Sequence, residues 1–346
     1  MKILLYSDNH WSQYSSIVRK RGKKYSLRLE NQIQSINWVH YIAKQLNCNA
    51  IFCLGDFFDK SELNSEEITA LREVNWLSRM PYYFIVGNHE MGSHNHQFSS
   101  MKLFNLLEKY TVIDIPKEIN ICDDLVEIYV LPYITEDDRK SLKEYIPPKT
   151  DKKRIILSHN DLKGIQINGA FVSKTGFDIE EIESLCDLFI NGHLHNGYQV
   201  SKKIINIGNL TGQNFSENAD KYPHVIFVLD TETLRVDVYE NPCALNFYKL
   251  EIDENNLDVI DNLKTNSIVT IKCSDSLYDI VKTKVLSNEN ILESRIIINR
   301  VQNAYSNITE DNLISLDHLQ EFRNYILETL GRNEIIEAEL SEVTSL

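Results

Sequence analysis

Residues 2–10 read Lys-Ile-Leu-Leu-Tyr-Ser-Asp-Asn-His, a short apolar run that ends in Asp8, Asn9 and His10. Four further runs end in the same way, in clusters of histidine, aspartate and asparagine. These are 50–54 before Gly55-Asp56-Phe57-Phe58-Asp59, 82–86 before Gly87-Asn88-His89-Glu90, 154–157 before Ser158-His159-Asn160, and 187–190 before Asn191-Gly192-His193-Leu194-His195. Apolar runs of this length are typical of strands buried on both faces. Polar residues that follow such strands collect at one edge of a sheet, where α/β folds build their sites.

Helix patterns lie between these strands. Residues 29–46 place apolar side chains at three- and four-residue spacing, which predicts an amphipathic helix. Further helices are predicted over 65–79, where Asn64 and Glu67 could form a capping box, and over 101–110. The alternation of strand and helix over the first half of the chain predicts an α/β fold.

The composition limits the class of protein. The chain has 346 residues, 42% of them hydrophobic and 25% charged, which is an ordinary globular profile for one large domain or two domains. No apolar run approaches the ~18 residues that cross a bilayer, so no membrane span is expected. Six scattered cysteines without a C-x-x-C pair favour a reducing, cytoplasmic location. With a net charge of −14, the chain cannot hold nucleic acid by bulk charge, so any polyanion must meet a local basic patch or bound metal ions.

The polar ends of the strands have the residue types of a metal site. Five of the ten histidines lie in them, together with Asp8, Asp56 and Asn88. Imidazole and carboxylate ligands without thiolate suit a borderline divalent ion such as manganese, iron or zinc. The set is too large for one tetrahedral ion, and a pair of ions that share a carboxylate fits it better. Two divalent ions carry more positive charge than Asp8, Asp56 and a bridging hydroxide carry negative charge, so the site would keep a net positive charge. Such a site should favour an anion whose negative charge grows during the reaction, as in phosphoryl transfer.

Each motif alone would more often be a strand-end cap or a turn than a ligand set, but all five in order resemble the calcineurin-like metallophosphoesterases. The resemblance covers residues 1 to about 215. It implies a four-layer α/β/β/α sandwich that carries two divalent metal ions, and we expect these to be Mn²⁺. One ion would be held by Asp8, His10, Asp56 and His195, and the other by Asp56, Asn88, His159 and His193, with Asp56 bridging. His89 would bind no metal but would contact the phosphate and help to protonate the leaving oxygen.

Within this superfamily the layout is most similar to the SbcD-type (meiotic-recombination) DNA nucleases, and to their short phage form. The compact motif spacing, Leu131-Pro132-Tyr133 after a strand and an appended C-terminal module favour this subgroup. It implies an exonuclease and endonuclease that cleaves phosphodiester bonds with a bridging hydroxide, in a DNA repair and recombination complex. Asp59 departs from the subgroup, where many members carry histidine, and could orient a metal ligand instead. The alternatives are a phosphatase or phosphodiesterase for small molecules or phosphoproteins, and a non-catalytic scaffold.

A basic segment follows the first motif. Six basic residues lie within ten positions, and no acidic residue lies between them: Arg19, Lys20, Arg21, Lys23, Lys24 and Arg28. At the edge of the site this segment would hold DNA phosphates, although a solvated basic loop is the alternative.

The C-terminal part differs in character. After a predicted hairpin of 225–229 with 234–239, we expect the metallophosphoesterase domain to end near residue 240. Residues 241–346 should form a smaller α+β capping domain, followed by a partner-binding helix and an acidic tail. The strands are expected at 246–252, 267–272 and 294–299, and the helices at 276–287 and 315–330. By resemblance, the partners would be DNA and an SbcC-type coiled-coil ATPase. The same unit could instead form a homodimer or only stabilise the chain.

Overall fold

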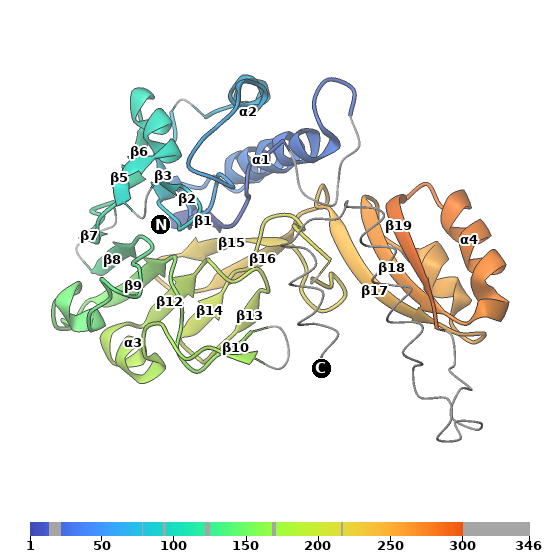
Figure 1. The fold of residues 1–346 in the computed structure, drawn as a ribbon. Helices are drawn as coiled ribbons and strands as arrows, with labels where there is room; N and C mark the ends of the chain where they lie inside the picture. The colour runs from blue at the N-terminus through green and yellow to red at the C-terminus, as the bar shows by residue number, and fades with distance from the viewer. Residues whose placement is uncertain are drawn as a thin grey trace, which may run out of the picture. The chain divides into compact units, whose positions relative to one another are not determined.

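The computed structural model describes residues 1–13, 22–77, 79–92, 95–121, 125–167, 171–215 and 217–299. Within these ranges the chain forms two six-stranded sheets, a three-stranded sheet and two short hairpins (Figure 1). The hairpins pair β4 (Met91–Gly92) with β5 (Asn95–Ser99), and β10 (Gln166–Ile167) with β11 (Phe171–Val172).

The first large sheet has the order β16-β15-β1-β2-β3-β6. Its strands are β1 (Lys2–Tyr6), β2 (Ala50–Cys53), β3 (Tyr82–Ile85), β6 (Tyr110–Ile113), β15 (Val225–Asp230) and β16 (Val236–Glu240). The strands β1, β2, β3 and β6 run parallel, whereas β15 is antiparallel to both β1 and β16. The predicted hairpin of β15 with β16 is confirmed. This arrangement brings the ends of β1, β2 and β3 to one edge of the sheet.

The second large sheet has the order β13-β14-β12-β9-β8-β7. Its strands are β7 (Lys117–Glu118), β8 (Val126–Leu131), β9 (Lys153–Ser158), β12 (Leu188–Asn191), β13 (Tyr198–Gln199) and β14 (Ile204–Asn206). The four central strands are parallel, and the short edge strands β7 and β13 are antiparallel to their neighbours.

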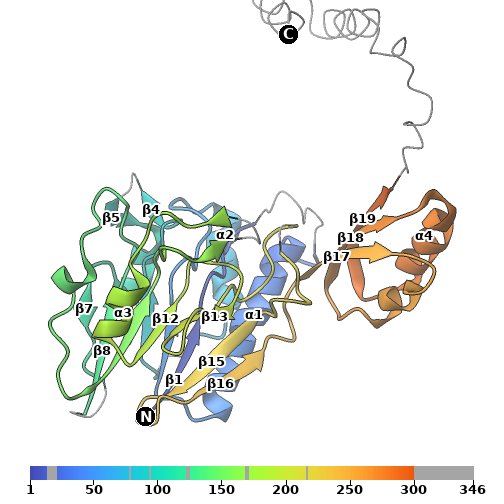
Figure 2. The same cartoon turned by 90° about the horizontal axis from the view of Figure 1, so that it is seen from below.

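Alternate residues of each central strand enter different cores, which explains why the strands are apolar on both faces. Ile3 and Leu5 of β1 pack between the two sheets, whereas Leu4 and Tyr6 pack on the outer side against helix α1 (Leu27–Gln45). In the second sheet, Phe189 packs on the outer side with α3 (Ile179–Leu185). The layers are therefore helix, sheet, sheet and helix, and the predicted sandwich is confirmed (Figures 1 and 2).

The first two α-helices each begin directly after a residue whose side chain caps the helix N-terminus. Ser26 caps α1 by accepting a hydrogen bond from the amide of Leu29. Asn64 and Glu67 form the predicted capping box of α2 (Ser65–Ala70). The rest of the predicted 65–79 helix is wrong, because α2 passes into a 3₁₀ turn over Leu71–Glu73 and the chain becomes extended at Val74.

The predicted α-helix at 101–110 is also wrong. A 3₁₀ helix covers Ser100–Leu106 instead. Of its side chains only Met101 and Phe104 are buried, and their three-residue spacing suits a 3₁₀ helix, in which residues i and i+3 eclipse. Leu106 is exposed, so the apolar composition that favoured an α-helix does not correspond to a buried face.

The C-terminal residues form a parallel sheet of β17 (Asn246–Ile252), β18 (Ser267–Cys273) and β19 (Ile291–Ile298). One face packs against α4 (Tyr278–Ser287). Short 3₁₀ turns complete the described chain at Leu142–Glu144, Leu257–Asn262 and Asp275–Leu277. The domain boundary near residue 240 stays a prediction, and the predicted helix at 315–330 and the acidic tail lie outside the described residues.

Five cysteines lie in the described part of the chain, and each is a free thiol. In the same part, no helix combines the length and the apolar character that crossing a membrane requires.

A buried ion pair joins β8 to β9. Arg154 is 0% and Glu127 6% exposed, and Arg154 donates from Nε and Nη2 to Oε2 of Glu127, at 2.9 and 2.7 Å. Burial acts to raise the pKa of Glu127, but hydrogen bonds from Arg154 and Thr150 lower it overall. Folding therefore favours the charged carboxylate. The ion pair therefore stabilises the folded state at pH values above the ordinary carboxyl pKa. This stabilisation is lost as the pH falls through the lower pKa that Glu127 has in the folded protein.

We predict that Glu127→Gln lowers the free energy of unfolding by about 3 kcal/mol near neutral pH, because it leaves a buried guanidinium without its counter-charge. The difference from wild type should shrink below about pH 4, where Glu127 itself takes up a proton. Urea unfolding at both pH values measures this. The control is Asp237→Asn on the exposed Arg235 pair, which should change stability by less than about 1 kcal/mol. An equal effect of the two substitutions would contradict the prediction.

Candidate metal centre

The predicted ligands come from both large sheets. Asp8 and His10 follow β1, Asp56 follows β2 and Asn88 follows β3, whereas His159 follows β9 and His193 and His195 follow β12. Backbone hydrogen bonds join the loops, from the amide of Asp8 to Gly55 O at 3.1 Å and from the amide of His10 to Asp56 O at 2.9 Å. The amide of His193 donates to Asp8 Oδ2 at 3.0 Å and so links the two sheets. The structure thus brings all seven predicted ligands to one place.

Each buried carboxylate is anchored by one oxygen and presents the other. Oδ2 of Asp8 accepts from His193 and from the Ser7 hydroxyl, and Oδ1 is buried without a hydrogen-bond partner among the described residues. Oδ1 of Asp56 accepts from the amide of His89 at 3.0 Å. Oδ2 of Asp56 lies 3.1 Å from His159 Nε2 and 4.0 Å from His10 Nε2. Asp56 therefore lies between two groups of histidines, where a bridging ligand would be.

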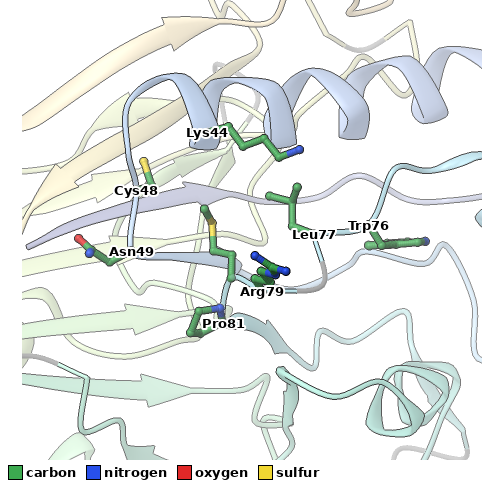
Figure 3. Close-up of a pocket in the computed structure, with 8 residues that line it drawn as sticks. Lys44, Cys48, Asn49, Trp76, Leu77, Arg79 and Pro81 are labelled. Carbon is green, nitrogen blue, oxygen red and sulfur yellow. The ribbon is translucent and has the colours of Figure 1, made fainter.

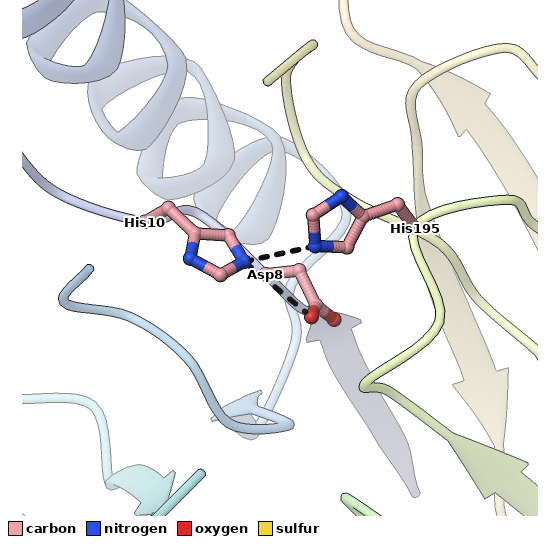
Figure 4. Close-up of side chains that lie close together, drawn as sticks. All are labelled: Asp8, His10 and His195. Atoms are coloured by element: carbon pink, nitrogen blue, oxygen red, sulfur yellow. Dashed lines mark hydrogen bonds and ion pairs between the residues drawn. The ribbon is translucent and has the colours of Figure 1, made fainter. Parts of the chain in front are cut away.

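The first group contains Asp8, His10 and His195 (Figure 4). The Nε2 atoms of the two imidazoles are 3.1 Å apart, and Asp8 Oδ1 lies 3.8 Å from His10 Nε2. The other ring nitrogens face carboxylates. His10 Nδ1 is 3.1 Å from Asp59 and His195 Nδ1 is 3.3 Å from Glu217. Both rings can therefore donate outward through Nδ1–H and keep an Nε2 lone pair for a common ligand.

The second group contains Asp56, His159 and His193, with Asn88 between the two imidazoles. Asn88 Oδ1 lies 3.3 Å from His159 Nε2 and 3.0 Å from His193 Nδ1. His159 uses its other nitrogen on Leu54 O at 2.6 Å, and His193 Nε2 lies 3.0 Å from Asp161 Oδ1. Again each ring has one nitrogen held from outside and one that faces the group.

These acceptors fit a cation. When Nδ1 of His10 and of His195 carries the proton, two lone pairs and the partnerless Asp8 Oδ1 face one another at close range, and they repel unless a positive charge lies among them. Burial acts to lower the pKa of His10, but Asp59 and Asp8 outweigh it and raise this pKa to about 10. The carboxylates therefore hold a positive charge at this point, which a divalent ion supplies as well as a proton does.

The backbone at the centre is strained. Asp8, His10, Asp56 and His193 have φ values of 50°, 47°, 47° and 73°, in the left-handed region that side chains rarely adopt. Conformations of this kind cost on the order of 1 kcal/mol or more each and are found chiefly where function requires them. Hydrogen bonds between the loops hold these residues in place, as described above.

The predicted role of His89 in leaving-group protonation stays a prediction, but its placement is clear. Its side chain is 40% exposed, and its Nδ1 lies 2.9 Å from Asp59 O. The His89 ring lies edge to face with that of His10, 4.6 Å between centroids. Asp59, expected to orient a ligand, contacts His10 and lies 3.6 Å from His89 Nδ1.

The basic segment is only partly described. Arg19, Lys20 and Arg21 lie outside the described residues, Lys23 is exposed, and Lys24 forms an ion pair with Glu73. Arg28 does not fit the expected contact with DNA, because it is 2% exposed and donates through Nη2 to His10 O at 3.2 Å. Its position in the first turn of α1 turns it inward, beneath the first group of ligands.

The sequence interpretation missed two carboxylates that contact ligand histidines. Asp161 lies two residues after His159 and pairs with Arg139 at 2.9 Å as well as with His193. Its proximity to His159 was a signal in the sequence that could have identified it. Glu217 lies far from any motif, and no local pattern indicates it. Burial opposes ionisation of Asp161, but His193 and Arg139 lower its pKa to about 2.

A cavity of about 540 Å³ lies at the opposite edge of the first sheet, where β2 and β3 begin (Figure 3). Its described lining residues are Lys44, Cys48, Asn49, Trp76, Leu77, Arg79, Met80 and Pro81. None of these is a predicted site residue, so the cavity is separate from the candidate metal centre.

Residues 1–197 match the family model of the calcineurin-like phosphoesterases. Two solved structures resemble the chain at 12% identity. A dimetal phosphatase from Danio rerio has a TM-score of 0.40 over 69% of this chain and 98% of its own. The phosphoesterase Yfce from E. coli has a TM-score of 0.32 over 70% of this chain and 100% of its own. Similarities this low carry no conclusion about activity. No curated protein sequence matches the chain.

We predict that Gly87→Ala reduces metal uptake. A Cβ at this glycine would lie 2.1 Å from Asp56 Oδ1, so the alanine must displace the carboxylate that lies between the two groups. The bound Mn²⁺ per chain, measured by elemental analysis after desalting, should fall below the wild-type value. The control is Gly164→Ala, where a Cβ meets no atom within 4 Å but the φ of 82° strains an alanine, so this variant should lose some stability and keep wild-type metal content. Full uptake by the Gly87 variant would contradict the prediction.

Proposed function

Because the chain belongs to the calcineurin-like phosphoesterase family, we propose that it is a two-metal DNA phosphodiesterase, with exonuclease and endonuclease activity, that works with a coiled-coil ATPase. The observation that carries the phosphoesterase part is the double group of buried acceptors centred on Asp56. The restriction to DNA rests on the motif layout, the basic segment and the appended three-stranded sheet.

The two groups define two ion positions in this proposal. Asp8, His10, His195 and Asp56 would hold one ion, and Asp56, Asn88, His159 and His193 the other. When bound, a pair of divalent ions polarises a phosphate ester and lowers the pKa of a water molecule. The protein's own part is to keep Asp8 Oδ1 and Asp56 Oδ2 directed at the centre, through the backbone amides that hold their second oxygens.

His89 is the candidate general acid. Among the motif histidines, all of which the structure describes, His89 is the one with an exposed side chain, and its ring still contacts that of His10 in the first group. Because Nδ1–H donates to the carbonyl oxygen of Asp59, a second proton would be carried on Nε2, and the imidazolium would transfer that proton to the leaving oxygen and return to the neutral ring. Histidine is the side chain most often found in this role.

The alternative function is a phosphatase or phosphodiesterase for small molecules or phosphoproteins. Two described members of the basic segment favour it, because Arg28 is buried and Lys24, although exposed, pairs with Glu73, so both offer less charge to a DNA phosphate. The two functions differ in their substrate and not in their metal chemistry.

Incubation of the full chain with Mn²⁺ and end-labelled single- and double-stranded DNA tests the proposal. A bis-nitrophenyl phosphate diester and a nitrophenyl phosphate monoester serve as small substrates in parallel. We expect cleavage of DNA and of the diester, and loss of DNA cleavage after chelation of the metal. Turnover of either small substrate, with DNA intact even when a cognate ATPase is present, would favour the alternative.

We predict that His89→Gln and Asp56→Asn separate metal binding from chemistry. His89→Gln removes the proton donor but keeps the backbone amide that anchors Asp56, so metal content should be unchanged while cleavage falls by roughly 10²- to 10⁴-fold. Asp56→Asn removes a shared anionic ligand and should reduce both. Elemental analysis and rate measurements on the same preparations check this, and equal metal loss in the two variants would refute the division of roles.

A further inference from the structure

Glu217 is a buried carboxylate that contacts a predicted metal ligand. It is 5% exposed, and its Oε1 lies 3.3 Å from His195 Nδ1. The backbone amide of Gln213 donates to both of its oxygens, at 3.2 and 3.1 Å. The side-chain amide of Asn214 also donates to Oε1, at 3.5 Å. These neutral donors compensate a buried carboxylate only in part, and the imidazole of His195 is the partner that can carry a positive charge.

The segment that carries Glu217 connects the centre to the three-stranded sheet. On the side of the centre, the amide of Leu210 donates to Ser7 O at 2.9 Å. Toward the sheet, the amide of Gly212 donates to Leu245 O at 3.0 Å, and the amide of Ala219 donates to Phe247 O at 2.8 Å. Backbone bonds on both sides of Glu217 therefore attach this segment to β17 and to the residue that precedes it.

Side chains support the same attachment. The rings of Phe215 and Phe247 lie edge to face, 5.4 Å between centroids, and Phe247 is fully buried. A Cβ at Gly212 would lie 2.4 Å from Leu245 O and 2.5 Å from the Phe247 ring, so that the segment and β17 touch with no room for a side chain. The position of Glu217 is thus set by contacts with the small sheet.

We propose that Glu217 is a positioning residue that fixes the His195 imidazole for metal binding, and that its attachment to β17 makes one of the two ion positions depend on the three-stranded sheet. The inference rests on the proposed two-metal function and deepens it. By holding the Nδ1–H of His195, Glu217 presents the Nε2 lone pair to the ion position shared with Asp8 and His10. Asp161 plays the corresponding part for His193, at the other position.

The test is calorimetric titration of the metal-free full chain with Mn²⁺, in which no substrate is involved. We expect the wild type to bind two ions and Glu217→Gln to bind one of them about 10- to 100-fold more weakly. Asp161→Asn should weaken the other ion, and the double variant should weaken both. In a His195→Ala background, Glu217→Gln should cause no further loss, because the imidazole through which it acts is gone.

Phe215→Ala tests the attachment to the sheet, since it removes a ring from the contact with Phe247 and leaves every predicted ligand in place. We expect it to weaken the same ion as Glu217→Gln does. Thermal unfolding of each metal-free variant checks that the fold is retained, and Glu217→Asp, which keeps the carboxylate, should recover part of the affinity.

Two results would overturn the inference. If the wild type binds two ions and Glu217→Gln binds both with unchanged affinity, Glu217 does not position His195, although the proposed function stands. If Phe215→Ala leaves both affinities unchanged, the dependence on the small sheet is wrong. A wild-type chain that binds no Mn²⁺ would overturn the inference together with the proposed function.

Discussion

The central constraint on this protein is an excess of buried negative charge at one edge of its two sheets. Asp8 and Asp56 are almost fully buried, and Asp59, Asp161 and Glu217 add further carboxylates around the same histidines. Removing a carboxylate from water costs several kcal/mol unless a counter-charge compensates. Arg139 pairs with Asp161, and the buried guanidinium of Arg28 acts on Asp59 and Glu217 through its charge. For Asp8 and Asp56 the compensating charge comes from the histidines around them or from a cation bound among them. Hydrogen bonds between the loops keep this arrangement in place against the strain of their backbone.

The sequence predicted the parts of the fold that depend on local pattern. The five apolar runs became central strands, because each must be apolar on both faces to lie between two layers. The α/β/β/α layering and the hairpin of β15 with β16 were likewise correct. The helix at 101–110 was wrong because composition does not show which side chains will find a core. Met101 and Phe104 find one, and Leu106 does not.

The centre was predictable only in part, for a physical reason. Motif residues lie next to strand ends, and parallel strands bring those ends together, so sequence order was enough to place the histidines and aspartates. Glu217 and Arg28 reach the centre through tertiary packing, with no strand end beside them. For Arg28 the charge pattern even indicated the wrong environment, since it belongs to a basic run but lies inward on α1. Whether the polar groups around the ligands can be read from sequence therefore depends on their distance from the strand ends.

The division of the ligands between two sheets has a consequence for how the protein is made. Four of the predicted ligands are synthesised long before His193 and His195: Asp8, His10, Asp56 and Asn88. The strand β15, which pairs with β1, is synthesised later still. A nascent chain thus carries half of the acidic loops with no imidazoles opposite them. Such a chain would bind a metal ion only weakly, because it lacks part of each predicted ligand set. Under the proposed two-metal function, neither ion position would therefore be complete until residues from both sheets have been synthesised.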